Sequence, residues 1–200
     1  MLLTRLNLME KTQMHKNVFD LPEIGRDSYS MLDRSDLSIS RLETMQGMIS
    51  GNSLEHILSC LQANMELLHI KAKNYHWNVS GSGFQGVHGM FDELEDYARQ
   101  VGDRIAERMR YHCVKVDATA ANYLSHAWFS EGNADLDMDG MLSDMCMTLM
   151  CIIEKMDEFD GDLATYPVDQ SMLQEINEGL GKYCYFVKSN MSHSSGDVSY

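Results

Sequence analysis

Proline is nearly missing from this chain, which has only two prolines among its 200 residues. Long runs of β-branched residues are also scarce. A sandwich of short strands with frequent turns normally shows both features, so this architecture is disfavoured. Methionine is abundant instead, with 17 residues, and it is a good helix former. These observations predict an all-α protein built from long, uninterrupted helices.

Paired cysteines are missing as well. The five cysteines are odd in number, scattered and without a CxxC motif, at Cys60, Cys113, Cys146, Cys151 and Cys184. This pattern indicates neither a disulfide framework nor a zinc ribbon. We therefore expect reduced thiols.

Long apolar runs are absent from the sequence. No segment reaches the roughly 18 consecutive apolar residues of a membrane-spanning helix. The first residues, MLLTRLNLMEK, do not form an apolar stretch that ends in a small-residue cleavage site. The sequence predicts no membrane association, and the cytoplasm is the expected location.

Positive charge is in deficit, because 16 basic residues face 30 acidic residues and give a net charge of −14. Such a chain repels nucleic acids and anionic membranes and attracts cations, so metal ions are the expected partners. Residues 1–50 carry six bases and seven acids, so this N-terminal extension is not a basic arm. Its weak periodicity predicts a partly ordered extension.

Apolar residues at three- and four-residue steps predict a first helix from the N-cap Ser53 to about Val79. The sequence Ser80-Gly81-Ser82-Gly83 breaks it. A second apolar stripe follows, on Val87, Phe91, Leu94, Ala98, Val101 and Ile105. The two helices are expected to form an antiparallel hairpin.

The second half of the chain predicts two more long helices, over about 137–160 and 168–188. The connection that precedes them contains a short helical segment within 118–128. Four long helices with one long crossover indicate a ferritin-like four-helix bundle over 51–190, followed by a short polar tail, 191–200. The third helix is rich in methionine, which we expect to fill the core, at Met138, Met141, Met145, Met147, Met150 and Met156.

Two pairs of potential metal ligands lie on the second predicted helix. His88 and Asp92 are four residues apart, as are Asp103 and Glu107, so each pair can share a ligand. The interval of 11 residues returns the pairs to nearly the same face but about 16 Å apart, so one ion cannot touch both pairs of one chain. This face is distinct from the apolar stripe. Two copies of the helix packed antiparallel across a two-fold axis would make two equivalent intersubunit sites.

His76 lies 12 residues before His88, across the Gly-rich turn, and can join the first pair. The set then contains two histidines and three carboxylates. Nitrogen and hard oxygen ligands without thiolates suit Fe(II), and they fit Zn or Mn less specifically.

These residues lie in a string that resembles the signature of the Dps family, the miniferritins. The string contains Asn74-Tyr75-His76-Trp77-Asn78-Val79, then Gly81, Phe84, His88, Phe91-Asp92, Asp103 and Ala106-Glu107-Arg108. All five ferroxidase positions of the family are matched, with the intervals 12, 4, 11 and 4 intact. The resemblance implies a hollow homo-oligomeric shell of twelve subunits with tetrahedral symmetry. In it, His76, His88 and Asp92 of one chain face Asp103 and Glu107 of its two-fold mate.

The resemblance further implies a ferroxidase activity. The family binds Fe(II), oxidises it with hydrogen peroxide in preference to dioxygen, and stores ferric mineral, which protects against oxidative damage. Trp77 resembles the family tryptophan that passes electrons or traps radicals, and simple packing against a neighbour is the alternative. By the same analogy Asp157, Asp160 and Asp162 would line a pore or the cavity, although acidic residues there also fit a solvated face.

Three alternatives accompany this interpretation. Some family members compact DNA through a Lys-rich N-terminal arm, but this extension is net negative, which makes direct DNA binding doubtful and leaves metal-bridged contact open. A structural bundle with a vestigial or zinc-occupied site is another alternative. Glu66 and His69 form a single Glu-x-x-His motif, for which packing is the preferred interpretation.

Overall fold

The computed structural model describes residues 52–191, and all regular structure within that range is helical. This confirms the all-α prediction. The expectations for residues 1–50 and for the polar tail lie outside the described residues, apart from Met191. The elements are α3 (Leu54–Asn78), α4 (Phe84–Tyr111), α5 (Ala120–Ser125), α6 (Met138–Asp160), the 3-10 turn η2 (Gly161–Leu163) and α7 (Pro167–Asn190).

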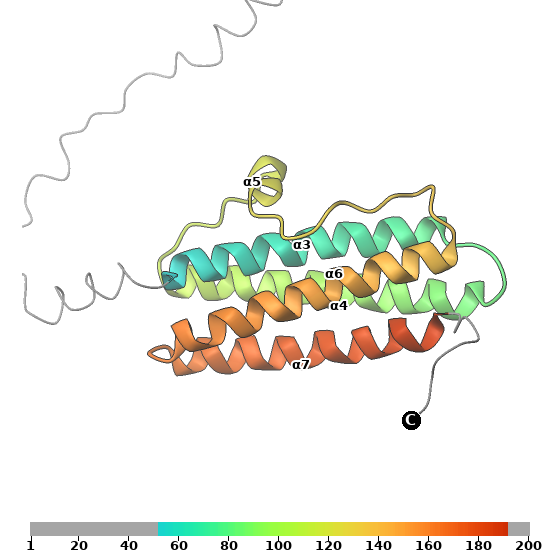
Figure 1. Ribbon diagram of the computed structural model, residues 1–200. Helices are drawn as coiled ribbons and strands as arrows, with labels where there is room; N and C mark the ends of the chain where they lie inside the picture. The colour runs from blue at the N-terminus through green and yellow to red at the C-terminus, as the bar shows by residue number, and fades with distance from the viewer. Residues whose placement is uncertain (1–51, 192–200) are drawn as a thin grey trace, which may run out of the picture. The chain divides into compact units, whose positions relative to one another are not determined.

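The helices α3 and α4 form the predicted antiparallel hairpin (Figure 1). Ser53 caps α3, because its Oγ accepts a hydrogen bond from the backbone N–H of His56 at 3.2 Å. The turn to α4 uses positive φ angles at Gly81 (110°) and Gly83 (84°), which glycine adopts without steric cost. The hairpin therefore places the end of α3 beside the beginning of α4.

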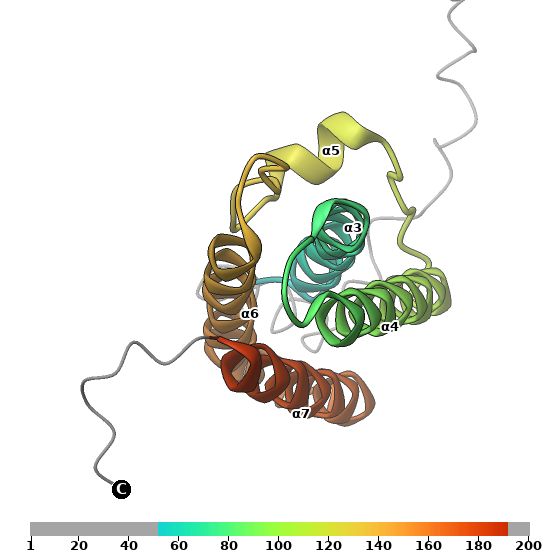
Figure 2. The same cartoon turned by 90° about the vertical axis from the view of Figure 1, so that its right-hand side faces the viewer.

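The helices α6 and α7 form a second antiparallel hairpin against the first, which completes a ferritin-like four-helix bundle (Figure 2). Asp137 caps α6 by accepting a hydrogen bond from Gly140 N at 2.8 Å. The 3-10 turn η2 follows α6 directly, and Pro167 occupies the first turn of α7, where its missing N–H costs nothing.

The short helix α5 lies outside the bundle in the long connection between α4 and α6 (Figure 2). It confirms the predicted short helix but is shorter than the segment 118–128. Thr119 caps it through a 3.3 Å hydrogen bond to Asn122 N, and none of its residues is buried. Without an apolar face to bury, only one and a half turns or so remain helical.

The core lies between the four long helices. The predicted stripe of α4 is buried throughout, at Val87, Phe91, Leu94, Ala98, Val101 and Ile105. On α6, Met141, Met145 and Met156 are also buried, but Met147 is 69% exposed and Met150 42% exposed. The core prediction is wrong for these last two, because the 100° helical step turns them to the side away from Met145. All five cysteines carry free thiols, as expected.

Buried polar groups fasten α6 to α3. Lys71, which is 2% exposed, pairs with Asp144 at 2.6 Å and donates to Thr148 Oγ1 at 2.8 Å. Tyr75 also donates a hydrogen bond to Asp144. Burial of an ammonium group costs free energy unless it is paired and hydrogen-bonded, as it is here.

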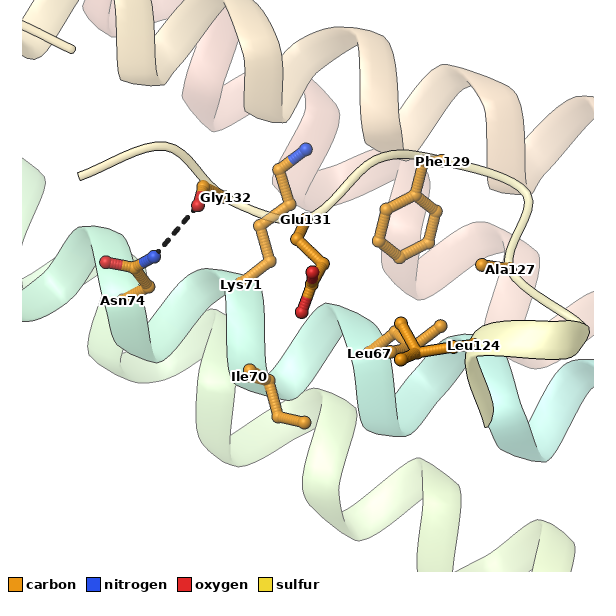
Figure 3. A pocket seen from close by; sticks show the side chains of 9 residues that line it. All are labelled: Leu67, Ile70, Lys71, Asn74, Leu124, Ala127, Phe129, Glu131 and Gly132. Carbon is orange, nitrogen blue, oxygen red and sulfur yellow. Dashed lines mark hydrogen bonds between the residues drawn. The ribbon is translucent and has the colours of Figure 1, made fainter. Parts of the chain in front are cut away.

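The connection runs along α3 and is held there by side chains of that helix. Lys71 Nζ donates to Ser130 O at 2.9 Å, and Asn74 Nδ2 donates to Gly132 O at 3.1 Å. A cavity of about 160 Å³ remains between α3 and this connection (Figure 3). None of the predicted site residues lines it; its lining is Leu67, Ile70, Lys71, Asn74, Leu124, Ala127, Phe129, Glu131 and Gly132.

No helix between residues 52 and 191 has the length and apolar character that crossing a lipid bilayer requires.

Candidate metal centre

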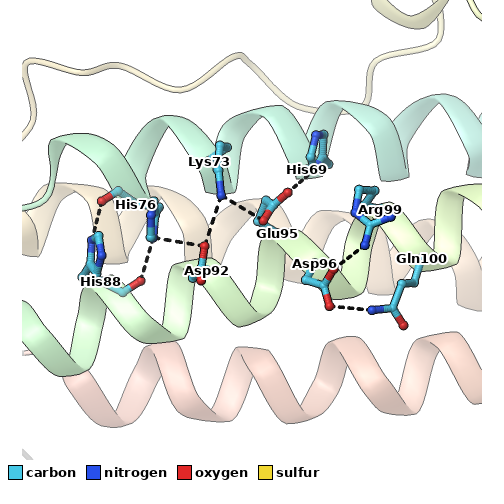
Figure 4. A network of polar contacts seen from close by, with 9 residues as sticks. All are labelled: His69, Lys73, His76, His88, Asp92, Glu95, Asp96, Arg99 and Gln100. Carbon is cyan, nitrogen blue, oxygen red and sulfur yellow. Dashed lines mark hydrogen bonds and ion pairs between the residues drawn. The ribbon is translucent and has the colours of Figure 1, made fainter.

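Two of the predicted ligands, His76 and His88, face each other where α3 ends and α4 begins (Figure 4). Their rings stack with centroids 3.8 Å apart. His76 Nδ1 is 3.0 Å from the carbonyl oxygen of His88, and His88 Nδ1 is 2.8 Å from that of His76. A carbonyl only accepts, so each Nδ1 carries the proton and each Nε2 keeps its lone pair. Metal-binding histidines are typically held in this way.

The third predicted ligand, Asp92, lies one helical turn after His88. Its Oδ1 is 3.5 Å from His76 Nδ1, and its side chain is 54% exposed. Lys73 donates to the same oxygen at 3.1 Å, and this hydrogen bond lowers the pKa of Asp92. The Asp92 carboxylate thus lies on the Nδ1 side of His76, and it is much more exposed than the His76 side chain, which is 13% exposed.

The remaining two predicted ligands lie farther along α4. Because the helix runs unbroken from Phe84 to Tyr111, Asp103 is about 16 Å beyond Asp92 along the axis. Asp103 and Glu107 are both exposed. One chain therefore brings His76, His88 and Asp92 together and leaves the second pair apart. The five-ligand site between two chains stays a prediction.

Asp103 has an acidic neighbour on α3. The pKa of the Glu66 carboxyl is raised by burial and further by the charge of Asp103, against opposing effects from His69 and Gln62. The Glu66 carboxylate lies over Gly102, since a Cβ at that glycine would be 2.9 Å from Glu66 Oε1. Negative charge thus gathers around this second part of the face.

A ladder of polar contacts between α3 and α4 was not foreseen (Figure 4). Lys73 Nζ also lies 3.1 Å from Glu95 Oε2, and His69 Nδ1 lies 3.0 Å from Glu95 Oε1. The latter contact is an ion-pair distance without hydrogen-bond geometry, since His69 Nδ1 has no hydrogen-bond partner in the described chain. Helical spacing would have pointed to these residues: Lys73 precedes His76 by three positions, and Glu95 follows Asp92 by three.

Trp77 is next to His76 and is 70% exposed. Lys73 Nζ lies 5.9 Å from the centroid of its indole ring. Within one chain the ring therefore packs against little besides this ammonium group.

The three pore candidates lie at the end of α6 and in η2, and amide side chains contact each of them. Asp157 accepts from Asn177 at 2.7 Å, and Asp160 accepts from Gln174 at 2.8 Å. Asp162 instead accepts from Asn52 Nδ2 at 3.0 Å. Asp157 and Asp160 line one surface cavity of about 320 Å³, whereas Asp162 is not among its lining residues.

Comparison with known proteins agrees with this architecture. The family model of the ferritin-like domain matches residues 57–159. This range begins in α3 and ends in α6, so it includes all five predicted ligands.

Similar proteins and solved structures indicate which group of ferritin-like proteins this chain resembles. A DNA protection during starvation protein of Brevibacillus brevis is 28% identical over 130 residues, which are 64% of this chain and 87% of that protein. The crystal structure of a Dps protein from Bacillus brevis matches with a TM-score of 0.64 and 26% identity, covering 70% of this chain and 97% of that one. Dps of Mycobacterium smegmatis shares the fold with a TM-score of 0.68, at 22% identity over 74% of this chain and 91% of that one. The chain belongs to the ferritin-like family and, within it, to the Dps group of miniferritins.

Proposed function

We propose that this protein is a ferroxidase that takes Fe(II) as its substrate at a site completed by two chains. The observation that carries the proposal is the reciprocal hydrogen bonding of His76 and His88. It holds the proton on each Nδ1 and leaves a lone pair on each Nε2, and the carboxylate of Asp92, whose pKa is lowered, lies 3.5 Å from His76 Nδ1. Mixed nitrogen and carboxylate ligands without a thiolate favour iron, and Zn or Mn would be occupying ions rather than substrates.

The other half of the site would come from Asp103 and Glu107 of a two-fold mate. Exposed apolar side chains on the same helical hairpin support such a contact, because Ile70 is 53% exposed and Trp77 is 70% exposed. A single chain would leave this apolar surface in water. We propose that two-fold dimers of this kind assemble into a closed shell of twelve subunits with tetrahedral symmetry.

The reaction balances with hydrogen peroxide as the proposed preferred oxidant. Two Fe(II) ions lose one electron each, and one peroxide takes both electrons as its O–O bond breaks. Water supplies the remaining oxygen, protons are released, and ferric oxyhydroxide forms. The carboxylates would stabilise the higher charge of Fe(III). We propose that Trp77, the residue after His76, passes an electron to the site or traps a radical.

Storage and protection would follow from enclosure of this reaction. Ferric mineral would collect inside the shell, and removal of Fe(II) and peroxide together would limit hydroxyl radical formation. The net charge of −14 favours entry of cations, with Asp157, Asp160 and Asp162 as candidate pore or cavity residues. We place this activity in the cytoplasm, where the free thiols would stay reduced.

The alternative is a protein that compacts DNA with little ferroxidase activity. The name of the Brevibacillus relative refers to DNA protection. The net charge of this chain opposes contact with the phosphate backbone. Unchanged electrophoretic mobility of plasmid DNA at low salt, with and without Mg²⁺, would remove this alternative, and a retarded band would favour it.

Anaerobic Fe(II) loading followed by hydrogen peroxide tests the ferroxidase proposal. The double variant His88→Ala, Asp92→Ala should lose the fast rise in ferric absorbance. The matched control is His69→Gln, which alters a histidine on the same hairpin outside the site and should keep the fast phase. Equal rates in wild type and the double variant would refute the proposal.

A further inference from the structure

A second group of metal-type ligands lies near the beginning of α3, away from the ferroxidase residues. One ligand atom each of His56, Cys60 and His126 lies within 4.8 Å of the other two. Among residues 52–191, this is the one set of three His, Cys, Asp or Glu side chains that meets this spacing. We propose that it binds a thiophilic divalent cation, with Zn²⁺ as the expected occupant.

The distances within the group suit a tetrahedral ion. His56 and Cys60 are one turn apart on α3, and Cys60 Sγ is 3.6 Å from His56 Nε2. Zinc bonds of about 2.3 Å to sulfur and about 2.0 Å to nitrogen, at a tetrahedral angle, give a sulfur to nitrogen edge of about 3.5 Å, close to this distance. A ligand atom of the third residue, His126, lies within 4.8 Å of both.

His126 is held as a metal ligand usually is. Its Nδ1 donates to the carbonyl oxygen of Asn122 at 2.9 Å, which leaves the lone pair on Nε2. The backbone around it is fixed to α3 by the fully buried Asn64. The amide of Asn64 donates to His126 O at 2.8 Å and accepts from Trp128 N at 2.9 Å. The hydrogen bonds of Asn64 thus fix the backbone that carries His126, the third proposed ligand, against α3.

Cys60 supplies the ligand that distinguishes this site from the ferroxidase centre. Its thiol is 4% exposed, and burial raises its pKa. A cation binds the thiolate, so binding displaces a proton and weakens as the pH falls. A thiolate selects Zn²⁺ over Fe(II) more strongly than the carboxylates of the other site do.

The proposed ion would link α3 to the segment that follows α5. Three protein ligands leave a fourth position for water, and two neutral imidazoles with one thiolate leave a single positive charge on the complex. The bound ion would hold the long connection against α3. The short helix α5 of this connection buries no residue of its own. Sequence reasoning missed the site because His126 is 66 residues from Cys60, and only the four-residue step from His56 to Cys60 was a local signal.

Cobalt titration of the metal-stripped full-length protein tests the proposal. Co²⁺ replaces Zn²⁺ and gives a near-ultraviolet charge-transfer band only when a thiolate binds it. Wild type should show this band, and Zn²⁺ should displace it. Cys60→Ser should abolish the band, while His56→Gln and His126→Gln should weaken Co²⁺ binding by at least about tenfold.

Two controls keep the result interpretable. His88→Ala removes a ferroxidase ligand and should leave the thiolate band unchanged, so failure of one proposal is distinguishable from failure of the other. His56 is exposed, and its replacement by Gln should leave the circular dichroism spectrum unaltered. Absence of the band in wild type, its persistence in Cys60→Ser, or wild-type affinity in both histidine variants would overturn the site.

Discussion

The imidazole rings of His76 and His88 stack with centroids 3.8 Å apart, and each Nδ1 donates to the backbone carbonyl of the other residue. This relationship exists because the glycine turn brings the end of α3 against the beginning of α4. It fixes the tautomer of both rings before any ion arrives. At the proposed iron site, little free energy would therefore be needed to orient these two predicted ligands.

Lys73 should oppose iron binding. Its ammonium lies 3.1 Å from Asp92 Oδ1, where it repels an incoming cation. Lys73→Gln should lower the half-saturating Fe(II) concentration of the fast oxidation phase severalfold, because the substitution removes a positive charge beside the Asp92 carboxylate. Stopped-flow measurements would check this. The control Lys182→Gln, an exposed lysine on α7, should change nothing, and an unchanged or higher half-saturation in Lys73→Gln would contradict the prediction.

Gly179 permits the close approach of α7 to α4. A Cβ at this position would overlap the hydroxyl of Tyr97, whereas a Cβ at Gly181 would meet nothing within 4 Å. Gly179→Ala should therefore destabilise the fold by on the order of 2 kcal/mol. Gly181→Ala should stabilise it by about 0.5 to 1 kcal/mol, because alanine favours helix. Urea unfolding of both variants measures the difference, and equal midpoints would show that Tyr97 moves freely.

The buried ammonium of Lys71 should contribute strongly to stability. Lys71→Met leaves Asp144, Thr148 and Ser130 O without this donor. The expected loss of unfolding free energy is on the order of 2 kcal/mol, because Thr148 and Ser130 O lose a buried donor, while Asp144 is 36% exposed and keeps its hydrogen bond from Tyr75. Lys155→Met removes a surface pair with Glu158 and should leave stability nearly unchanged. If Lys71→Met lost little unfolding free energy, a buried apolar side chain at this position would stabilise the fold as well as the paired ammonium group does, which would contradict the prediction.

Asp169 should make stability depend on acid pH. It is 1% exposed, and although burial opposes the shift, hydrogen bonds from Arg108 and His112 lower its pKa below the usual value. A carboxylate with a lowered folded-state pKa stabilises the fold above its unfolded-state pKa of about 3.9. This contribution is lost as pH falls further, through the folded-state pKa.

Asp169→Asn should accordingly be less stable than wild type at pH 7, by on the order of 2 kcal/mol. The difference should shrink below about pH 4 as the wild-type carboxylate becomes protonated. Thermal melting across this range is the measurement. Glu178→Gln, an exposed change on the same helix, should follow wild type. A difference in stability between Asp169→Asn and wild type that stays constant with pH would contradict the prediction.

The long helices and the faces of α4 could be predicted because local spacing determines them. The stripe from Val87 to Ile105 repeats at the helical period, and it is buried as expected, while Asp92 and Asp103 are exposed. The cap at Ser53 was an equally local signal. Such features depend on residues three or four positions apart.

Features that depend on packing between distant segments could not be predicted in this way. Nothing local in the sequence links Asn64 to the backbone of His126, or Lys71 to Asp144. Exposure of Met147 was missed because composition was taken as evidence of burial. The partnership of Asp103 with a second chain is a property of the assembly, so it stays a prediction.

Mixing two inactive variants tests the intersubunit site most directly. One variant carries His76→Ala and His88→Ala, and the other carries Asp103→Asn and Glu107→Gln. Each alone should lack fast peroxide-driven Fe(II) oxidation, whereas an equal mixture, unfolded and reassembled together, should recover about a quarter of the wild-type rate, because random pairing rebuilds that share of sites. Native mass spectrometry would show whether assemblies containing both variants have formed. If they have formed and remain inactive, that result would contradict a site shared between two chains.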